Sequence, residues 1–410
     1  MISFSNLLSD AIRTSQLAHL PYRNQACQTY TEKHCTICPA IQFSYSDELK
    51  IKEQVFREFW KKNNLSGQIE PLVASPMGRR YRTNSKRRVF NKKLKEPVIL
   101  GFTEIMEFGI RPFSVIDCPI EPEEHSRIYN YIQDFVNNRE GFTLGNALNH
   151  VIIKGNYEEY TVIFSTQFFS TKINSLVNRL SKLLTHTFPK ITGIFIVADV
   201  PGKFYLSSKA EQRSLKKIFG NKEVFEEVGD KKFLYSPVAF SQTNSSMIVL
   251  MVEKVKNFLK LNKGVTVLDL YCGYGLFGLS LAGLVQSVIG MEISKEAIVS
   301  AKDNARRQNA TGTRFFCAPI TPSSLQKIHF NPAETAAILD PPRSGTDEGV
   351  IEWLADSGIR QALHVFCEID LIPLELSRWT KKGYQVARVV PLDMFPATQH
   401  IETIVLLERK

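Results

Sequence analysis

The sequence predicts an α/β protein whose C-terminal half is built on a parallel, doubly wound sheet. From about Gln242, apolar strand-like segments alternate regularly with helical segments, which is typical of a parallel sheet covered by helices. The first of these strands, Val265 to Leu270, runs directly into a glycine-rich turn at Gly273-x-Gly275-x-x-Gly278, where the backbone can turn tightly and approach a ligand closely. The preceding residues lack this alternation and predict a separate α+β part.

Composition and charge narrow the class of protein. The 410 residues leave room for two or three domains, and 43% hydrophobic with 22% charged residues is ordinary for a soluble globular chain. No apolar run has the length of a membrane span or the form of a signal peptide, so we expect a cytoplasmic monomer without membrane contact. The net charge of +10 indicates a polyanionic partner.

Three segments follow one another along the chain. Residues 1–45 should form a lead-in helix, Met1 to Leu20, and a loop-like stretch with three cysteines. Residues 46–235 should form a central α+β RNA-binding domain, with a helix at Ile173–Leu184 and strands at Pro97–Gly101, Val151–Ile153, Thr161–Ser165 and Gly193–Val200. Residues 236–410 carry the alternating pattern.

A basic stretch from Arg79 to Lys95 concentrates the positive charge. It holds nine lysines and arginines and no acidic residue. Tyr81 and Phe90 lie between these charges, and aromatic rings can stack on unpaired bases. The alternative is a solvated surface hairpin, but nine cations without an acid favour nucleic acid, because they repel one another unless something neutralises them.

The expected elements of the C-terminal segment begin with a helix at Ser246–Leu261. Its expected strands are Val265–Leu270, Ser287–Glu292, Arg314–Cys317, Ala336–Asp340, Ala362–Cys367, Gln385–Val390 and His400–Leu407. The last two lie close together with a polar turn between them, which predicts an antiparallel pair at one edge of the sheet.

Polar residues at the ends of these strands predict a cofactor site. Glu292 ends the strand after the glycine turn, where a carboxylate can accept both hydroxyls of a ribose. A nicotinamide enzyme would share these two features. It would not need the motif Asp340-Pro-Pro-Arg343, in which a double proline presents an acid at the end of the fourth strand. The combination favours S-adenosylmethionine.

A thiol and a carboxylate near the end of the chain are candidate catalytic groups. Cys367 ends an apolar strand, and Glu402 lies where the turn from Phe395 enters the last strand. These groups can attack a ring carbon and later remove its proton. Taken alone, each would more often be a buried structural thiol or a solvated acid; their place in this fold favours chemistry.

Four further cysteines, Cys27, Cys35, Cys38 and Cys118, predict a metal site. Cytosolic chains seldom keep disulfides, so ligation is the better account of the pattern. By number alone, four thiolates suit zinc and an iron–sulfur cluster equally well.

With these motifs placed, the chain resembles the RNA uracil-5-methyltransferase (m5U) family from Cys27 onward. The match extends to Phe240-Ser-Gln-Thr-Asn244, similar to the family's Phe-x-Gln-x-Asn element. The resemblance implies a Rossmann-like, S-adenosylmethionine-dependent methyltransferase domain beside an α+β domain that carries a cysteine cluster. It implies Cys367 as nucleophile and Glu402 as base, and donor contacts from Gln242, Tyr271, Gly273, Gly275, Glu292 and Asp340.

The cysteine spacing resembles the [4Fe–4S] site of the family's ribosomal-RNA branch, whose members lack an N-terminal TRAM domain. The resemblance favours the cluster over zinc and 23S rRNA as the substrate, with tRNA as the alternative. Two positions depart from the family pattern: Glu368 follows the nucleophile where an asparagine is usual, and Ala318 stands where an acid is often found.

Two other functions compete with this reading. One is a non-catalytic RNA-binding protein that keeps the fold. The other is an amino-group methyltransferase, but such enzymes usually place an aromatic residue after the double proline and need no thiol, so Arg343 and Cys367 argue against it.

Overall fold

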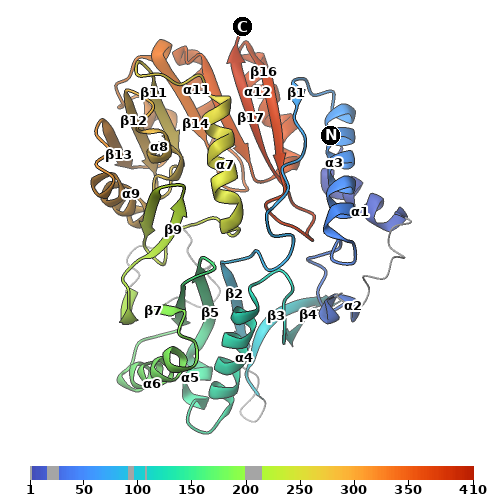
Figure 1. Cartoon of the computed structure of the whole chain (residues 1–410), viewed down its shortest axis with the longest axis vertical. Coiled ribbons are helices and arrows are strands. Elements are labelled where there is room, and N and C mark those ends of the chain that lie inside the picture. The colour runs from blue at the N-terminus through green and yellow to red at the C-terminus, as the bar shows by residue number, and fades with distance from the viewer. Residues whose placement is uncertain (1, 16–26, 91–96, 107–108, 199–214) are drawn as a thin grey trace.

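The structure is a computed structural model, which describes residues 2–15, 27–90, 97–106, 109–198 and 215–410. Two β-sheets organise these residues (Figure 1). The C-terminal sheet carries the late strands, and a second sheet below it in Figure 1 carries the strands of the central part. Among the described residues, no helix combines the length and apolar character needed to span a bilayer.

The C-terminal sheet has eight strands in the order β1-β16-β17-β15-β14-β11-β12-β13. Its central strands are parallel, while β17 is antiparallel to both β15 and β16. The seven predicted strands are all present, as is the predicted antiparallel pair. The bounds are β1 Gln68–Ile69, β11 Thr266–Leu270, β12 Ser287–Glu292, β13 Thr313–Cys317, β14 Thr335–Leu339, β15 Gln361–Phe366, β16 Tyr384–Leu392 and β17 Glu402–Arg409.

Helices cover both faces of this sheet, because successive side chains of a strand point to opposite faces. One apolar core joins the sheet to α7 Ser245–Phe258, α8 Leu276–Leu281 and α9 Lys295–Arg307. The other joins it to α11 Val350–Ser357, α12 Ile372–Lys381 and two helices from the start of the chain, α1 Phe4–Thr14 and α3 Tyr45–Lys62. Short helical turns are α2 Gln28–Thr31, α10 Pro322–Leu325, η3 Pro332–Glu334 and η4 Ile369–Leu371.

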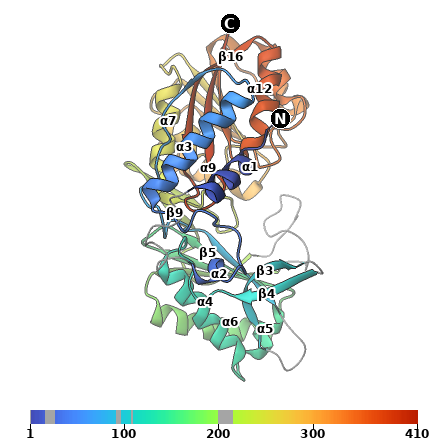
Figure 2. The ribbon, with the colours of Figure 1, turned by 90° about the vertical axis from the view of Figure 1, so that its right-hand side faces the viewer.

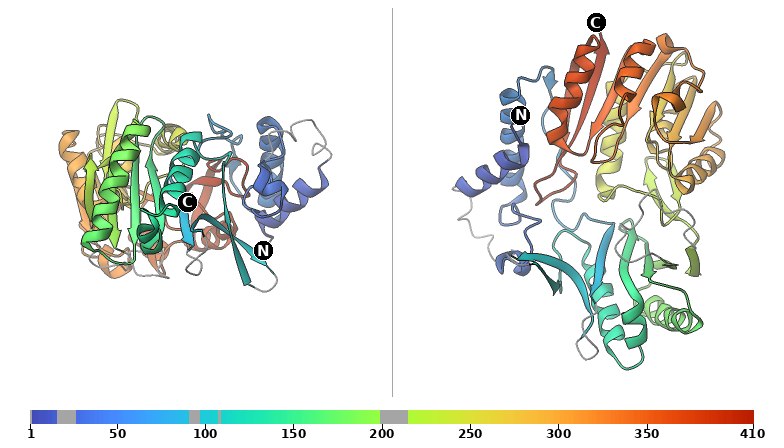
Figure 3. Two further views of the ribbon diagram at one scale, coloured as in Figure 1. Left: turned by 90° about the horizontal axis from the view of Figure 1, so that it is seen from below. Right: turned by 180° about the vertical axis from the view of Figure 1, so that it is seen from behind.

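The N-terminal elements therefore belong spatially with the C-terminal sheet. Strand β1 pairs in parallel with β16 and forms the sheet edge, which the sequence did not predict because two residues show no periodicity. Helices α1 and α3 share an apolar core with α12, and both lie beside the last strands when the molecule is seen from the side or from behind (Figures 2 and 3). The short helix α2 lies instead beside β3 and β4 of the central sheet (Figure 1). The predicted lead-in helix is present as α1, while residues 1 and 16–20 lie outside the described ranges.

The central sheet is mixed, with seven strands in the order β4-β3-β2-β5-β6-β7-β8. It includes the four predicted strands, although Val200 lies outside the described ranges. Its elements are β2 Ser85–Phe90, β3 Ile99–Met106, β4 Gly109–Ser114, β5 Leu148–Gly155, β6 Tyr160–Thr166, β7 Ile191–Ala198 and β8 Leu215–Gly220, with helices α4 Glu123–Asn137, α5 Phe142–Ala147 and α6 Thr171–Thr187 on one face. The hairpin of β9 Val224–Val228 and β10 Lys231–Tyr235 leads from it toward α9.

The basic stretch is not a uniformly solvated surface. Its middle is strand β2, in which buried and exposed residues alternate, so Arg87 faces the core while Arg88 faces solvent. Arg87 is 0% exposed and donates two hydrogen bonds to Glu121, at 2.7 and 2.5 Å. Tyr81 is also fully buried, so its predicted role in base stacking is wrong. Residues 91–96 lie outside the described ranges.

Candidate active site

The glycine turn after β11 has the backbone shape that close ligand approach requires. Gly273 and Gly275 have φ of +53° and +88°, a region that glycine enters without strain. No atom lies within 4 Å of a Cβ added at Gly273, so its face is open. Tyr271 also has a positive φ, +63°, and its hydroxyl donates a hydrogen bond to Asp347 at 2.8 Å.

Three carboxyl groups gather behind this turn. Asp269 is buried in β11 and accepts the backbone N–H of Gly278 at 2.8 Å, while its Oδ1 has no hydrogen-bond partner. Burial raises the pKa of Asp269 to about 7, and the nearby Glu292 carboxylate adds to the shift. Burial, followed by the charges of Asp269 and Glu292, raises the pKa of Asp340 to about 7. Such a site favours a cationic ligand, because a positive charge would relieve the repulsion.

Cys367 and Glu402 lie close together at the end of the β15–β17 pairing. The antiparallel ladder ends with Phe366 opposite Thr403; Cys367 follows Phe366, and Glu402 precedes Thr403. The Glu402 carboxyl is near enough for its charge to act on the Cys367 thiol. The Cys367 thiol also lies 3.7 Å from the carbonyl oxygen of Pro341, in the motif that follows β14. Three strand ends thus meet at one place.

Burial and charge set the protonation states of these groups. Burial first, then the Glu402 and Asp340 charges, raise the pKa of the Cys367 thiol to about 12. Burial, followed by Asp340, raises the pKa of Glu402 to about 8. Arg343 is exposed and acts in the opposite direction on both groups. Glu402 is 4% exposed, and its Oε2 has no hydrogen-bond partner, so this oxygen can receive a proton.

The Phe240–Asn244 segment approaches the same end of the sheet. Asn244 is buried and donates a hydrogen bond to the carbonyl of Met394, in the loop that leads to Glu402, at 3.1 Å. Gln242 is buried, with its carbonyl accepting the side chain of Asn84 at 2.7 Å. Phe240 is 68% exposed, which leaves its ring available to a partner.

The four predicted metal ligands surround one small cavity. Cys27, Cys35, Cys38 and Cys118 all line it, and all four thiols are free. Burial, then the charges of Cys118, Cys35 and Cys27, raise the pKa of Cys38 well above its usual range. Within the described ranges, no group of three or more histidine, cysteine, aspartate or glutamate residues is placed to hold a metal ion. The thiols therefore share a cavity, and the metal stays a prediction.

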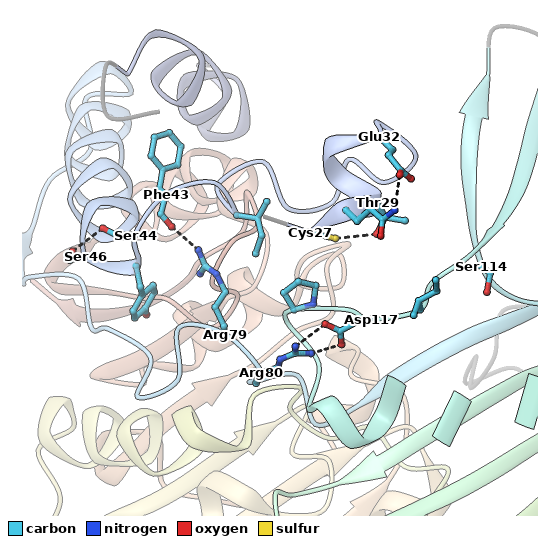
Figure 4. Close-up of a pocket in the computed structure, with 15 residues that line it drawn as sticks. Cys27, Thr29, Glu32, Phe43, Ser44, Ser46, Arg79, Arg80, Ser114 and Asp117 are labelled. Carbon is cyan, nitrogen blue, oxygen red and sulfur yellow. Dashed lines mark hydrogen bonds and ion pairs between the residues drawn. The ribbon is translucent and has the colours of Figure 1, made fainter. Parts of the chain in front are cut away.

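A second cavity, of about 840 Å³, adjoins the cysteine cavity (Figure 4). Cys367 is not among the residues that line it. Cys27 lies on its wall and contacts Thr29. Arg80 pairs with both oxygens of Asp117, at 2.7 and 2.8 Å, and Arg79 donates to the carbonyl of Phe43. Both arginines of this wall are thus engaged within the protein.

Comparison with known proteins decides the family. The family model described as tRNA (Uracil-5-)-methyltransferase matches residues 206–410, half of the chain. The chain belongs to the tRNA (uracil-5-)-methyltransferase family. It is therefore an enzyme, an S-adenosylmethionine-dependent RNA methyltransferase, as the sequence predicted.

Two relatives and one solved structure are similar to most of the chain. An uncharacterized RNA methyltransferase of Clostridium tetani is 28% identical over 96% of this chain and 86% of its own length. One from Nanoarchaeum equitans is 28% identical over 95% and 81%. The fold resembles the crystal structure of Pyrococcus abyssi tRNA (uracil-54, C5)-methyltransferase in complex with S-adenosyl-L-homocysteine, with a TM-score of 0.68 and 21% identity over 90% of this chain and 85% of that one.

The two departures from the family pattern lie differently in the site. Glu368 raises the pKa of Cys367 less than Glu402 and Asp340 do, so those two carboxyls have the larger effect on the thiol. Ala318 donates its backbone N–H to the carbonyl of Glu292 at 3.0 Å and supplies no charge there.

Sequence reasoning missed the residues that hold the loop before Glu402. They are Glu48 and Lys52 on α3, together with Asp393 after β16. One signal was present: the two helix residues are spaced i, i+4 on the same face as Phe56 and Phe59, so a charged pair interrupts an apolar stripe. A charged pair in that position indicates a buried partner elsewhere in the chain.

Proposed function

We propose that this enzyme methylates C5 of a specific uridine in RNA, most directly in 23S rRNA, with Cys367 as the nucleophile and Glu402 as the base. The observation that carries the proposal is the end of the β15–β17 ladder, which leaves Cys367 and Glu402 next to each other with the Glu402 charge acting on the thiol. A partly buried thiol beside a buried carboxyl that has an unpartnered oxygen suits a reaction with one addition and one proton removal.

The residues perform the following steps on a uracil ring. C5 is too weak a nucleophile to be methylated directly, so the Cys367 thiolate adds to C6 and gives the ring carbanion character at C5. After C5 is methylated, Glu402 takes the C5 proton. The electron pair of that C–H bond forms the C5–C6 double bond as the C6–S bond breaks, which frees Cys367 and leaves the proton on Glu402. The base must be unpaired or flipped out for its ring to be reached.

The methyl donor fits the residues around the glycine turn. S-adenosylmethionine, when bound, supplies an electrophilic methyl group on a cationic sulfonium. The open face at Gly273 and the raised pKa values of Asp269 and Asp340 suit a cationic ligand that approaches the backbone. The residues that would hold it are Gln242, Tyr271, Gly273, Gly275, Glu292 and Asp340.

Cys27, Cys35, Cys38 and Cys118 would hold a [4Fe–4S] cluster, because their spacing resembles the cluster site of the family's ribosomal-RNA branch. Zinc, which four thiolates also suit, is the alternative occupant. A cluster fills a cavity and takes thiolates at its periphery, as the cavity between Cys27, Cys35, Cys38 and Cys118 allows. Its role would be structural.

The cysteine pattern also supports 23S rRNA as the substrate, because it resembles the ribosomal-RNA branch of the family. A tRNA uridine is the second candidate, since the matching family and the Pyrococcus abyssi enzyme are both named for tRNA. The three-part division of the chain at residues 45 and 235, the monomeric state and the cytoplasmic location remain proposals.

The test is methyl transfer to purified 23S rRNA and to tRNA, followed by nucleoside mass spectrometry of each product. We expect 5-methyluridine in 23S rRNA and none with Cys367→Ala, whose activity should fall by at least about 10⁴-fold. Cys317→Ala removes another thiol, exposed at the end of β13, and should leave the product unchanged. Methylation only of tRNA would replace the substrate, and full activity of Cys367→Ala would overturn the mechanism.

A further inference from the structure

The loop that connects β16 to β17, residues 393–401, delivers Glu402 to the site. At its centre, Ala397 has φ of +70°, a left-handed conformation that an alanine adopts only at a cost. Such a strained residue persists only where its surroundings hold it, and strained residues concentrate at functional sites. The loop therefore depends on contacts from outside itself.

Helix α3 supplies the main contacts. The Ala397 N–H donates to Oε1 of Glu48 at 2.5 Å. Lys52 donates to Oδ1 of Asp393 at 2.8 Å and to the carbonyl of Phe395 at 3.2 Å, and it also pairs with Glu48 at 2.8 Å. Glu48, Lys52 and Asp393 are 1%, 0% and 0% exposed, so these bonds form without competition from water.

The charges in this network balance. Arg79 donates to Oε2 of Glu48 at 2.9 Å, so two cations, Arg79 and Lys52, neutralise the two carboxylates of Glu48 and Asp393. A buried ion network adds little net stability compared with apolar residues of similar volume, because desolvation of the charges opposes their attraction. Its geometric effect is stronger, because Glu48 holds the loop at Ala397 and Lys52 holds it at Asp393 and Phe395.

The cysteine-bearing segment holds the other side of the same residue. The carbonyl of Ala397 accepts the N–H of Ala40, two residues beyond Cys38, at 3.0 Å. Ala397 also packs in one apolar cluster with Ile41, Tyr81 and Cys38. Both backbone groups of the strained residue are therefore held by the first 50 residues of the chain.

We propose that Glu48, Lys52 and Asp393 are positioning residues, which hold the 393–401 loop so that the Glu402 carboxyl meets the C5 proton of the substrate. This inference rests on the proposed function. In that reaction, Cys367 adds to the base before Glu402 is needed. A loosened loop should therefore slow proton removal and product release, while addition and methyl transfer continue.

Glu48→Gln is the first test variant, because it keeps the shape of the side chain and removes the anionic acceptor of the Ala397 N–H. Lys52→Met is the second and removes all three bonds from the lysine. The matched control is Glu53→Gln, on the more exposed side of α3, where Glu53 forms an ion pair with Arg57. Folding of each variant is checked by its affinity for S-adenosylhomocysteine.

The readout is the fraction of enzyme trapped as a covalent RNA adduct on a denaturing gel, measured beside kcat and KM. Both test variants should lower kcat, by up to about 100-fold as expected for a displacement near 1 Å. They should accumulate a methylated adduct, so KM should fall together with kcat while S-adenosylhomocysteine affinity stays unchanged. The control should match the wild type. Unchanged kcat and adduct level would overturn the proposal, as would loss of adduct together with loss of S-adenosylhomocysteine binding.

Glu402→Gln separates this proposal from the one on which it rests. It should accumulate the adduct more strongly than either positioning variant. If Glu402→Gln forms the adduct and the positioning variants do not, the positioning role alone is wrong. If Glu402→Gln turns over normally, the assignment of the base fails and the positioning role fails with it.

Discussion

The two sheets place their charged groups in opposite ways. In the C-terminal sheet, Asp340, Cys367 and Glu402 lie at strand ends, where burial and their mutual charges raise their pKa values. In the central sheet, Arg87 lies within a strand and faces the core, where Glu121 neutralises it. The same burial thus has two consequences: a charge with a built-in partner supports the fold, and one without a partner is available for chemistry.

We expect the largest effect from substitution of a cysteine, which tests whether the cysteine site supports the fold and not donor binding. Protein purified anaerobically should hold about four irons per chain and be brown, and Cys38→Ser should lose the iron and the colour. If the cysteine site serves the fold alone, S-adenosylhomocysteine affinity should change little, because the donor residues lie in the C-terminal sheet. Iron content by mass spectrometry and calorimetric titration check this, with Cys317→Ser as the control. A colourless protein with one zinc would replace the cluster and keep the ligands.

The adjacent arginines of β2 give the second test. Arg87→Met leaves the Glu121 carboxylate buried without a partner, so we expect a loss of about 3–5 kcal/mol in the free energy of unfolding. Arg88→Met, one residue along and exposed, should change it by less than about 0.5 kcal/mol. Urea unfolding measures both. If Arg88 contacts RNA phosphate, its variant should also flatten the salt dependence of RNA binding by about one unit. Equal stabilities of the two variants would remove the distinction.

The third and smallest expected effect is a change in the alkylation rate of the Cys367 thiol. Because burial and two carboxylates raise its pKa to about 12, the thiolate is scarce at neutral pH, and alkylation should speed up as pH rises toward that value. The cationic donor should lower this pKa and neutral S-adenosylhomocysteine should not. At pH 8 we expect alkylation to be about tenfold faster with the donor if the donor lowers the pKa of the thiol by about one unit. Peptide mass spectrometry measures it, and equal rates with both ligands would contradict the cationic-site argument.

Much of the C-terminal sheet was predictable, because parallel strands covered on both faces give long apolar segments and end in motifs at fixed places. The motif residues were predictable for the same reason: Asp340 and Cys367 follow directly after such strands. The proximity of Cys367 to Glu402 could not be derived, since it depends on the register between β15 and β17.

The burial of residues in the central part was harder to predict, because a charged residue can be buried when its ion-pair partner lies far away in the sequence. Arg87 and Glu121 are 34 residues apart, and the basic stretch showed nine cations without showing which one was buried. The period-two alternation of β2 is a pattern of burial that the sequence does not show, because a charged residue, Arg87, occupies one of the buried positions. The hydrogen bond from Lys52 to Asp393 joins residues 341 positions apart, which no local sequence pattern can predict.

The pairing of β1 with β16 has a consequence for how the chain is made. Ribosomes release the first 70 residues long before the last strands exist, so α3 and β1 must wait with apolar residues uncovered until β16 emerges. A fragment begun at residue 236 would meet the reverse problem, because β16 would present a bare edge and the groove for α3 would be empty. Any excised catalytic fragment would therefore need the first 75 residues supplied as a second chain.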